Sequence, residues 1–548
     1  MPTQLDYLTT EHEQMMSMRR PWEPEWQEIR ELVHPMGQDF NRQLTPGNRG
    51  RTDKILDGTA MWALEQLASG LHSFLTSPTD RWFSLGVKNY DYPNDAQALK
   101  WLEAVADMMY DVYNKPASNS NNSLHETYLS VGSFGTAIEY QEWDMELQHV
   151  RFTPFPLADC HIKENNKKMV DTIYRKIKWT TRQVNQEFGE NRSPDKITKE
   201  KNQNKEWEII HAVFPRTDRD ASKLTQSNKP WASVWFCKEA KVVLRDSGYD
   251  YFPFHAPRWI KMPNETYGRS PAMICLPDIR LLNSMERVML KSIQKIVDPP
   301  LMVPDDGFVM PIQTMPASLI FYDSAMNPDQ MLRPLETKAQ VEVGEEKMQQ
   351  KRDHVMRCFY ADWIQRQKKK ERQTATEVMD DRDEMLQLMA PILGRQQSEL
   401  LGPRIALTYN LMLRAGQIPP APVSIQKKNL KIEYVSPAAK AQIARKGVNV
   451  TRFIEQLTPM AQIDPSVMDV IHPGRYAQEM AKIQDVTRNV LRTPEELAEI
   501  QDQKQKQQQA AAAAQTMEPV SNAIKNVAQA KDKGLDIEGM MSQAGLGQ

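Results

Sequence analysis

The feature that most constrains this chain is a pair of long helical segments separated by a stretch rich in proline. In 277–297, apolar residues recur on one face, and at 1.5 Å per residue a helix of this length spans roughly 30 Å. That apolar face consists of Leu282, Met285, Met289, Ile293 and Ile296. The second segment runs over 341–364, and short strand-like runs punctuated by proline lie between the two. The pattern predicts a helical hairpin with a folded tip.

The first helix of this hairpin carries two further signals. Ser270 precedes a proline, which is the pattern of an N-cap followed by proline at the first helical position, and Pro277 is expected to restart or kink the helix. Basic residues recur at every fourth position, as Arg287, Lys291 and Lys295. They form a basic stripe separate from the apolar face.

Before the hairpin, the pattern changes from helices to strands. Helical periodicity over 57–74 and 96–113 is followed by a predicted polar loop over 118–123. Short β-branched or aromatic runs then indicate an antiparallel meander and further strands, at 137–143, 149–155, 158–163, 170–179, 207–214, 231–237 and 241–245. Within this region, Thr180 or Thr181 is expected to cap a brief helix that ends at Gly189, before a charged exposed loop over 190–205.

After the hairpin, a basic run is followed by more helices. The run over 366–372 connects the second long helix to a capping box at 374–377. The helix that starts there is predicted to continue to Gly416, with a bend near Gly402 and Pro403. A second capping box at residues 493–496 begins a helix rich in Gln and Ala, which is either frayed or supported by copies of itself.

Charge and hydropathy exclude several classes of protein. Lys and Arg total 69 against 71 Asp and Glu, a formal charge of −2, so no basic excess is available to grip nucleic acid along the whole chain. No run approaches the roughly 18 apolar residues of a membrane-spanning helix, and the first residues lack the pattern of a signal peptide. We therefore expect a protein that is made and kept in a cytosol and does not insert into a membrane.

Motifs of catalysis and cofactor binding are absent from the sequence. It has no phosphate-binding, dinucleotide-binding, zinc-protease or nucleophile-elbow motif, and its four cysteines lack metal-ligand spacing. We interpret Cys160, Cys237, Cys275 and Cys358 as buried apolar residues. The acidic groups at 305–306 and 380–384 resemble nuclease carboxylates only in composition, and solvated charge is the simpler interpretation. We expect no enzyme, no catalytic residue, no metal and no cofactor.

Several stretches, in the same order along nearly the whole chain, resemble one family, the head-to-tail connector or portal proteins of short-tailed phages (podoviruses). The matching stretches are residues 57–60 (DGTA), 67–71 (LASGL), 75–78 (LTSP), 267–271 (YGRSP), 276–279 (LPDI), 298–301 (DPPL), 374–378 (TATEV) and 433–437 (EYVSP). Each is weak alone, and their common order makes the resemblance specific.

The resemblance implies an α+β, mainly helical subunit of a dodecameric ring. Its parts would be a wing over 1–269, a two-helix stem over 270–297 and 341–364, and a small α/β clip over 298–340. A tunnel loop would follow over 365–373, then a wing helix over 374–416, a crown over 417–492, and a C-terminal helical barrel and flexible tail over 493–548. The ring would occupy one vertex of the capsid in the virion, after assembly in the host cytoplasm.

The resemblance also implies partners and candidate residues. Double-stranded DNA would pass through the ring non-specifically, touching the tunnel-loop residues Arg366, Lys368, Lys369, Lys370 and Arg372. Arg287, Lys291 and Lys295 would line the channel or pair with acidic residues such as Glu345 and Glu346 on a neighbouring stem helix. The terminase large subunit and later the tail adaptor or tube proteins would dock at clip residues Pro299, Pro300, Asp305, Asp306 and Phe308. Major capsid protein and scaffold would surround the ring.

Two other interpretations remain open at this point. A structural tail or scaffold component would form no DNA channel, and a DNA-processing nuclease would require metal-dependent cleavage. Rings with a central hole in electron micrographs would favour the portal interpretation over both.

Overall fold

The computed structural model describes residues 4–40, 52–87, 96–189, 202–220, 225–297, 341–362, 387–426, 430–434 and 450–457, with Ile197, two short strands and isolated positions between 447 and 506. The chain divides into two units: Met1–Gly86, Glu103–Pro420 and Lys431–Gln442 form the first, and Val87–Leu102, Ala421–Leu430 and Ile443–Gln548 the second. The sites discussed below lie in the first unit. The fold mixes helices and sheets, in agreement with the expected α+β class.

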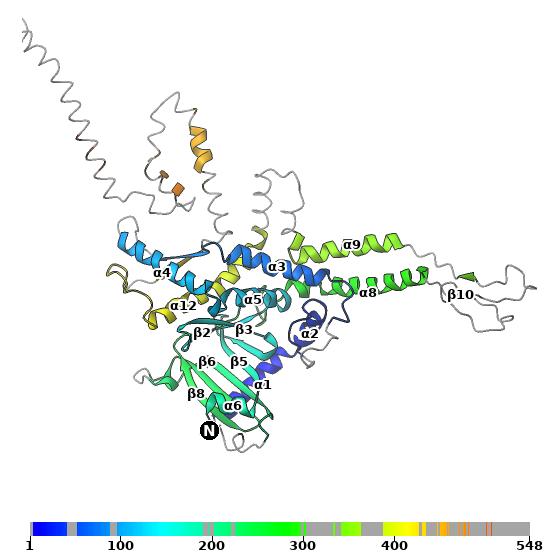
Figure 1. Cartoon of the computed structure of the whole chain (residues 1–548), viewed down its shortest axis with the longest axis horizontal. Helices are drawn as coiled ribbons and strands as arrows, with labels where there is room; N and C mark the ends of the chain where they lie inside the picture. Colours follow the sequence, from blue (N-terminus) through cyan, green and yellow to red (C-terminus); the bar gives the residue numbers. More distant parts are fainter. Residues whose placement is uncertain are drawn as a thin grey trace, which may run out of the picture. The chain divides into compact units, whose positions relative to one another are not determined.

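Helices and strands both precede the long helix pair (Figure 1). The helices are α1 (Gln4–Arg19), α2 (Glu23–Leu32), α3 (Thr59–Leu75), α4 (Ala96–Asn114), α5 (Ser120–Phe134) and α6 (Thr181–Phe188). The strands are β1 (Phe83–Val87), β2 (Ile138–Asp144), β3 (His149–Phe155), β4 (Cys160–Glu164), β5 (Val170–Thr180), β6 (Glu206–Pro215), β7 (Trp231–Cys237), β8 (Val242–Tyr249) and β9 (Phe254–His255).

The strands form two main sheets rather than one continuous meander. β4 to β8 follow one another in a five-stranded antiparallel sheet, whereas β3, β2 and β9 form a separate three-stranded sheet in that order. A 3-10 turn over Leu157–Asp159 interrupts the chain between the two sheets, so Ala158 does not belong to a strand. The expected single meander over 137–179 was wrong in this respect, because Pro156 and the turn end one sheet before the next begins.

The five-stranded sheet is covered on both faces. On β6, Ile210 and Ala212 contact Leu8 and Met15 of α1, whereas the preceding Ile209 belongs to the apolar cluster around α6. Successive residues of a strand point to opposite faces, so α1 and α6 cover different faces. Thr180 caps α6 through a capping box with Gln183, and Gly189 follows its last residue with φ of 81°, which confirms the predicted helix ends.

The segment predicted as a polar loop over 118–123 is largely helix. Ser118 ends a 3-10 turn, and α5 begins at Ser120. Ser118, Ser120 and Ser123 are all buried. Their hydroxyl groups have partners inside the protein, so a polar sequence here marks a buried polar cluster and not a surface loop.

The predicted hairpin is present as α8 (Pro271–Val297) and α9 (Val341–Cys358), with the short strands β10 (Leu301–Met302) and β11 (Arg333–Pro334) paired between them. The hydroxyl of Ser270 accepts the backbone N–H of Met273 at 3.0 Å, which confirms the predicted N-cap. Pro277 neither stops nor restarts α8, and it lies on the exposed side of the helix.

α9 is shorter than the predicted segment 341–364. Tyr360 adopts a positive φ of 57°, a backbone conformation that ends a helix. The turn directs Phe359 and Ala361 into the interior, where both are fully buried. Burial of Phe359 therefore decides where the helix ends, a tertiary effect that helical periodicity does not reveal.

The helix that precedes Gly416 is interrupted by a π-helical turn directly before Gly402, where the sequence predicted a bend. Helical residues 387–396 lead into a π-helical turn, Gln397–Leu401, and then into α12 (Gly402–Arg414). Gly416 follows with φ of 71°. The last described strand, β12 (Leu430–Tyr434), pairs with β1. The capping boxes at 374 and 493, most of the loop over 190–205 and nearly all of the Gln/Ala-rich helix lie outside the described residues.

Candidate functional site

α8 and α9 lie side by side and antiparallel, and their facing residues interdigitate (Figure 1). Gly344 leaves room for the Met289 side chain, which a Cβ at that position would strike. Further along the pair, the carboxylate of Asp278 contacts Nζ of Lys351 at 2.7 Å and Nδ1 of His354 at 2.8 Å. The hydrogen bond from Lys351 lowers the pKa of the Asp278 carboxyl. Apolar packing and an ion pair thus fix the register of the two helices.

Arg352 joins this helix pair to the segment before α3. Its guanidinium contacts Asp57 at 2.8 Å, Glu345 at 2.9 Å and Glu286 at 3.2 Å. Burial opposes ionisation of Asp57, but hydrogen bonds from Thr59 and Arg352 outweigh it and lower the pKa of this carboxyl.

Asn283 makes a second connection at the same place. Its side-chain oxygen accepts the backbone N–H groups of Leu56 at 2.9 Å and Asp57 at 3.2 Å. Asn283 lies on α8, whereas Arg352 lies on α9. Both helices are therefore held by the residues that directly precede α3.

The predicted basic stripe is exposed and points away from α9. Arg287 is two positions from both Met285 and Met289, which face α9, and two positions correspond to about 200° around a helix. Lys291 and Lys295 follow at intervals of four and are also exposed. Within the described residues, none of the three forms an ion pair.

The predicted acidic partners of the stripe do not meet it within one chain. Glu345 pairs with Arg352 of its own helix, and Glu346 accepts a hydrogen bond from Gln350. On the side of α9 away from α8, the exposed carboxylates are instead Glu342, Glu346 and Asp353. The pair consequently presents a basic row on α8 and an acidic row on α9, facing outward in different directions.

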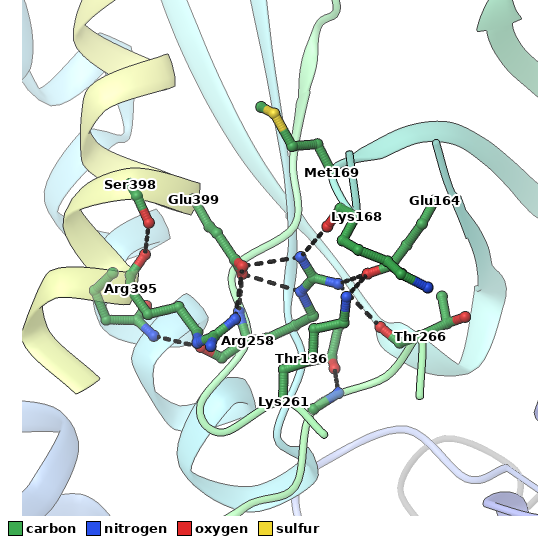
Figure 2. A network of polar contacts seen from close by, with 12 residues as sticks. Thr136, Glu164, Lys168, Met169, Arg258, Lys261, Thr266, Arg395, Ser398 and Glu399 are labelled. Atoms are coloured by element: carbon green, nitrogen blue, oxygen red, sulfur yellow. Dashed lines mark hydrogen bonds and ion pairs between the residues drawn. The ribbon is translucent and has the colours of Figure 1, made fainter. Parts of the chain in front are cut away.

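A buried arginine fixes the bent helix to the sheets (Figure 2). Arg258, which is 2% exposed, pairs with Glu164 at the end of β4 and with Glu399 in the π-helical turn. Its Nε and Nη2 lie 3.0 and 2.8 Å from the two oxygens of Glu399. Burial opposes the charge of Arg258, but the two carboxylates raise its pKa. The Gln396 amide donates to the backbone oxygen of Arg258 at 2.9 Å, so the turn is held from two sides.

A second buried pair holds α12. Arg404 and Glu139 are fully buried, with 3.3 Å between Nη1 and Oε1. Arg404 also donates to the hydroxyl of Ser120 at 2.8 Å, while the hydroxyl of Ser123 donates to Glu139 at 2.6 Å. Burial raises the pKa of Glu139 despite these partners. Sequence reasoning missed both arginine clusters, because their members are far apart in the chain and only the serine-rich segment hinted at them.

Comparison with known proteins shows the family of this chain. A family described as "Bacteriophage head to tail connecting protein" matches residues 5–491. The chain belongs to this family. A connector relative named "Probable portal protein", from Bordetella phage BPP-1, is 31% identical over 500 residues, which cover 90% of this chain and 89% of the relative. A "Portal protein" of Salmonella phage epsilon15 is 27% identical over 543 residues, covering 96% of each chain. The resemblance to phage connectors, and with it the function as a portal protein, is confirmed.

Two groups of predicted connector residues lie outside the described part of the chain. They are the tunnel-loop residues Arg366, Lys368, Lys369, Lys370 and Arg372, and the clip residues Pro299, Pro300, Asp305, Asp306 and Phe308. Among the described residues, no group of three or more His, Cys, Asp or Glu side chains is placed to hold a metal ion. No helix in that part of the chain has the length and apolarity needed to cross a membrane.

Proposed function

We propose that this connector subunit assembles into a dodecameric ring at one capsid vertex, through which double-stranded DNA enters and leaves. The α8–α9 pair would be the stem of the ring. The observation that carries this proposal is the presence of a basic row and an acidic row on different outward sides of the pair. If neighbouring subunits met through rows of the same charge, they would repel each other. If the basic row of one subunit lies against the acidic row of the next, the two subunits attract each other.

In this arrangement, Arg287, Lys291 and Lys295 of one subunit lie against Glu342, Glu346 and Asp353 of its neighbour. Exposed ion pairs contribute only about 0–1 kcal/mol each. Their main effect is therefore to set the orientation of neighbouring subunits, and apolar packing supplies most of the affinity. This assignment replaces Glu345, which is already paired with Arg352.

The remaining parts keep their proposed roles. Residues 1–269 and 374–416 form the wing, 298–340 the clip that receives the terminase large subunit and later the tail adaptor, and 417–492 the crown. Lys368, Lys369 and Lys370 in the tunnel loop contact DNA phosphates, and 493–548 contribute a barrel and a tail. Capsid protein and scaffold surround the ring in the virion, and the subunit itself performs no catalysis.

Charge reversal tests the proposed contact. Lys291→Glu alone and Glu346→Lys alone should each reduce the fraction of rings seen by electron microscopy and mass photometry, and the double variant should restore it. Lys347→Glu is a matched control, since Lys347 is an exposed residue of α9 outside both rows. Rings that form equally well in all variants would refute the contact and favour a channel position for Lys291. Failure of the unaltered protein to form any ring would refute the proposed function itself.

A further inference from the structure

Two thiols lie next to each other where α8 begins and α9 ends. Cys275 lies in the second turn of α8, Cys358 is the last residue of α9, and their side chains are hydrogen-bonded to each other. Cys275 is fully buried, whereas Cys358 is partly exposed. The interpretation of all four cysteines as buried apolar residues therefore fits Cys160, Cys237 and Cys275 but not Cys358.

The register of the helix pair brings these two residues together. Met289 of α8 faces Gly344 of α9, and Asp278 faces His354. In a pair of antiparallel helices, one turn toward the start of the first helix corresponds to one turn toward the end of the second. The next facing positions beyond Asp278 and His354 are Cys275 and Cys358, so the packing of the two backbones keeps the thiols adjacent.

We propose that Cys275 and Cys358 form a disulfide bond reversibly. The two thiols stay reduced in the cytosol during assembly, and small-molecule disulfides oxidise them to the disulfide once the protein leaves the cytosol. This chemistry belongs to the single chain and does not depend on ring formation. Cytosolic glutathione keeps such thiols reduced, and extracellular conditions favour the disulfide.

The two thiols have unequal roles in this reaction. The hydrogen bond from Cys275 and the nearby His354 lower the pKa of the Cys358 thiol to about 7, although its partial burial opposes this. The bond to Cys358 and burial raise the pKa of Cys275. The accessible Cys358 is thus the attacking thiolate, and Cys275 is the resolving thiol.

The reaction balances as an ordinary thiol–disulfide exchange. The Cys358 thiolate attacks one sulfur of a small-molecule disulfide, forms a mixed disulfide and expels one thiolate. Cys275 then gives up its proton and attacks Sγ of Cys358, which expels the second thiolate. The chain loses two electrons and two protons, and the oxidant gains both and becomes two thiols.

The test uses the full-length protein and glutathione disulfide. After incubation, denaturation and alkylation, the intact protein should carry two alkyl groups, on Cys160 and Cys237, whereas the reduced form should carry four. Peptide mapping should show one 275–358 cross-link, and the thermal midpoint should rise by a few degrees because the link constrains the unfolded chain. A reductant should reverse all three changes.

Two variants serve as controls. Cys358→Ser should show neither the cross-link nor the rise in midpoint, and Cys160→Ser/Cys237→Ser should retain both. A stable glutathione adduct on Cys358 of the unaltered protein, without the internal cross-link, would overturn the proposal. A cross-link between any other pair of cysteines would do so as well.

Discussion

Arg352 on α9 and Asp57 ahead of α3 form a hydrogen-bonded ion pair, with Nε of the guanidinium 2.8 Å from Oδ2 of the carboxylate. The same guanidinium reaches Glu286 on α8 and Glu345 on α9. One side chain therefore links both helices of the proposed stem to the segment that begins α3. The Asp57 side chain is only 6% exposed, so water cannot solvate its carboxylate fully if Arg352 is lost. Loss of this partner therefore lowers the stability of the fold.

Arg352→Met should lower the free energy of unfolding by about 2–3 kcal/mol, since it leaves a buried carboxylate without its charged donor. Urea unfolding measures this loss. Arg357→Met is the matched control on the same helix. Its side chain is 66% exposed and has one ion pair at 3.7 Å, so the loss should stay below about 1 kcal/mol. Equal midpoints for the two variants would contradict the proposed anchoring role.

Arg258→Met should be more destabilising, by about 3–5 kcal/mol, because Glu164 and Glu399 would lose their shared buried partner and keep only Lys261 and Arg395, respectively. Limited proteolysis should then cut near the π-helical turn, which Glu399 no longer fixes. Arg269→Met provides the comparison, since the Arg269 side chain is 41% exposed and, in the described part of the chain, forms its ion pair with Glu265 on the same short segment. If Arg258→Met is as stable and as resistant to protease as Arg269→Met, Arg258 does not fix the π-helical turn to the sheet.

Two glycines with similar backbone angles should respond differently to alanine. Gly135 has φ of 77°, and a Cβ there would collide with the carbonyl oxygen of Gly268. Gly189 has φ of 81°, but a Cβ there would meet open space. Gly189→Ala should therefore cost about 1–3 kcal/mol of backbone strain, and Gly135→Ala clearly more, to the point of preventing folding. Thermal unfolding and soluble yield compare them, and equal losses would show that the two chain segments separate easily.

The buried His12 makes stability sensitive to acid. Neither of its ring nitrogens has a hydrogen-bond partner in the described structure, and burial lowers its pKa to about 3. Below the ordinary histidine pKa of about 6.5, the unfolded chain binds a proton that the folded chain does not, so stability falls as the pH drops from about 6.5 toward 3.

His12→Leu should remove this contribution, which at about pH 4.5 amounts to roughly 2–3 kcal/mol relative to pH 8. Urea unfolding at the two pH values measures the change. Leu8→Ala, another buried position on α1, should lower stability by a similar amount at both values. A pH dependence of His12→Leu that runs parallel to that of the unaltered chain would show that His12 is not responsible.

The sequence correctly predicted the features that depend on neighbouring residues in the chain. The caps at Thr180 and Ser270, the Gly189 terminus and the helical hairpin all depend on residues within a few positions of one another, and all are present. The family resemblance, resting on short ordered stretches, was confirmed as well.

Features that depend on distant residues were not predictable. Nothing near Ser123 indicates that it lies against Glu139 and Arg404, and nothing near Cys358 indicates Cys275. The end of α9 moved because Phe359 is buried. For the candidate site, the basic stripe on α8 was found from its spacing, but its acidic counterpart required the orientation of α9.

The docking of α1 on the five-stranded sheet has a consequence for synthesis. Leu8 and Met15 are translated long before their partners Ile210, Val234 and Phe236. At roughly 5–20 residues per second, α1 waits on the order of ten seconds or more with its apolar side uncovered. During that interval it is a target for chaperones. α1 therefore reaches its native environment only after β7 has been translated.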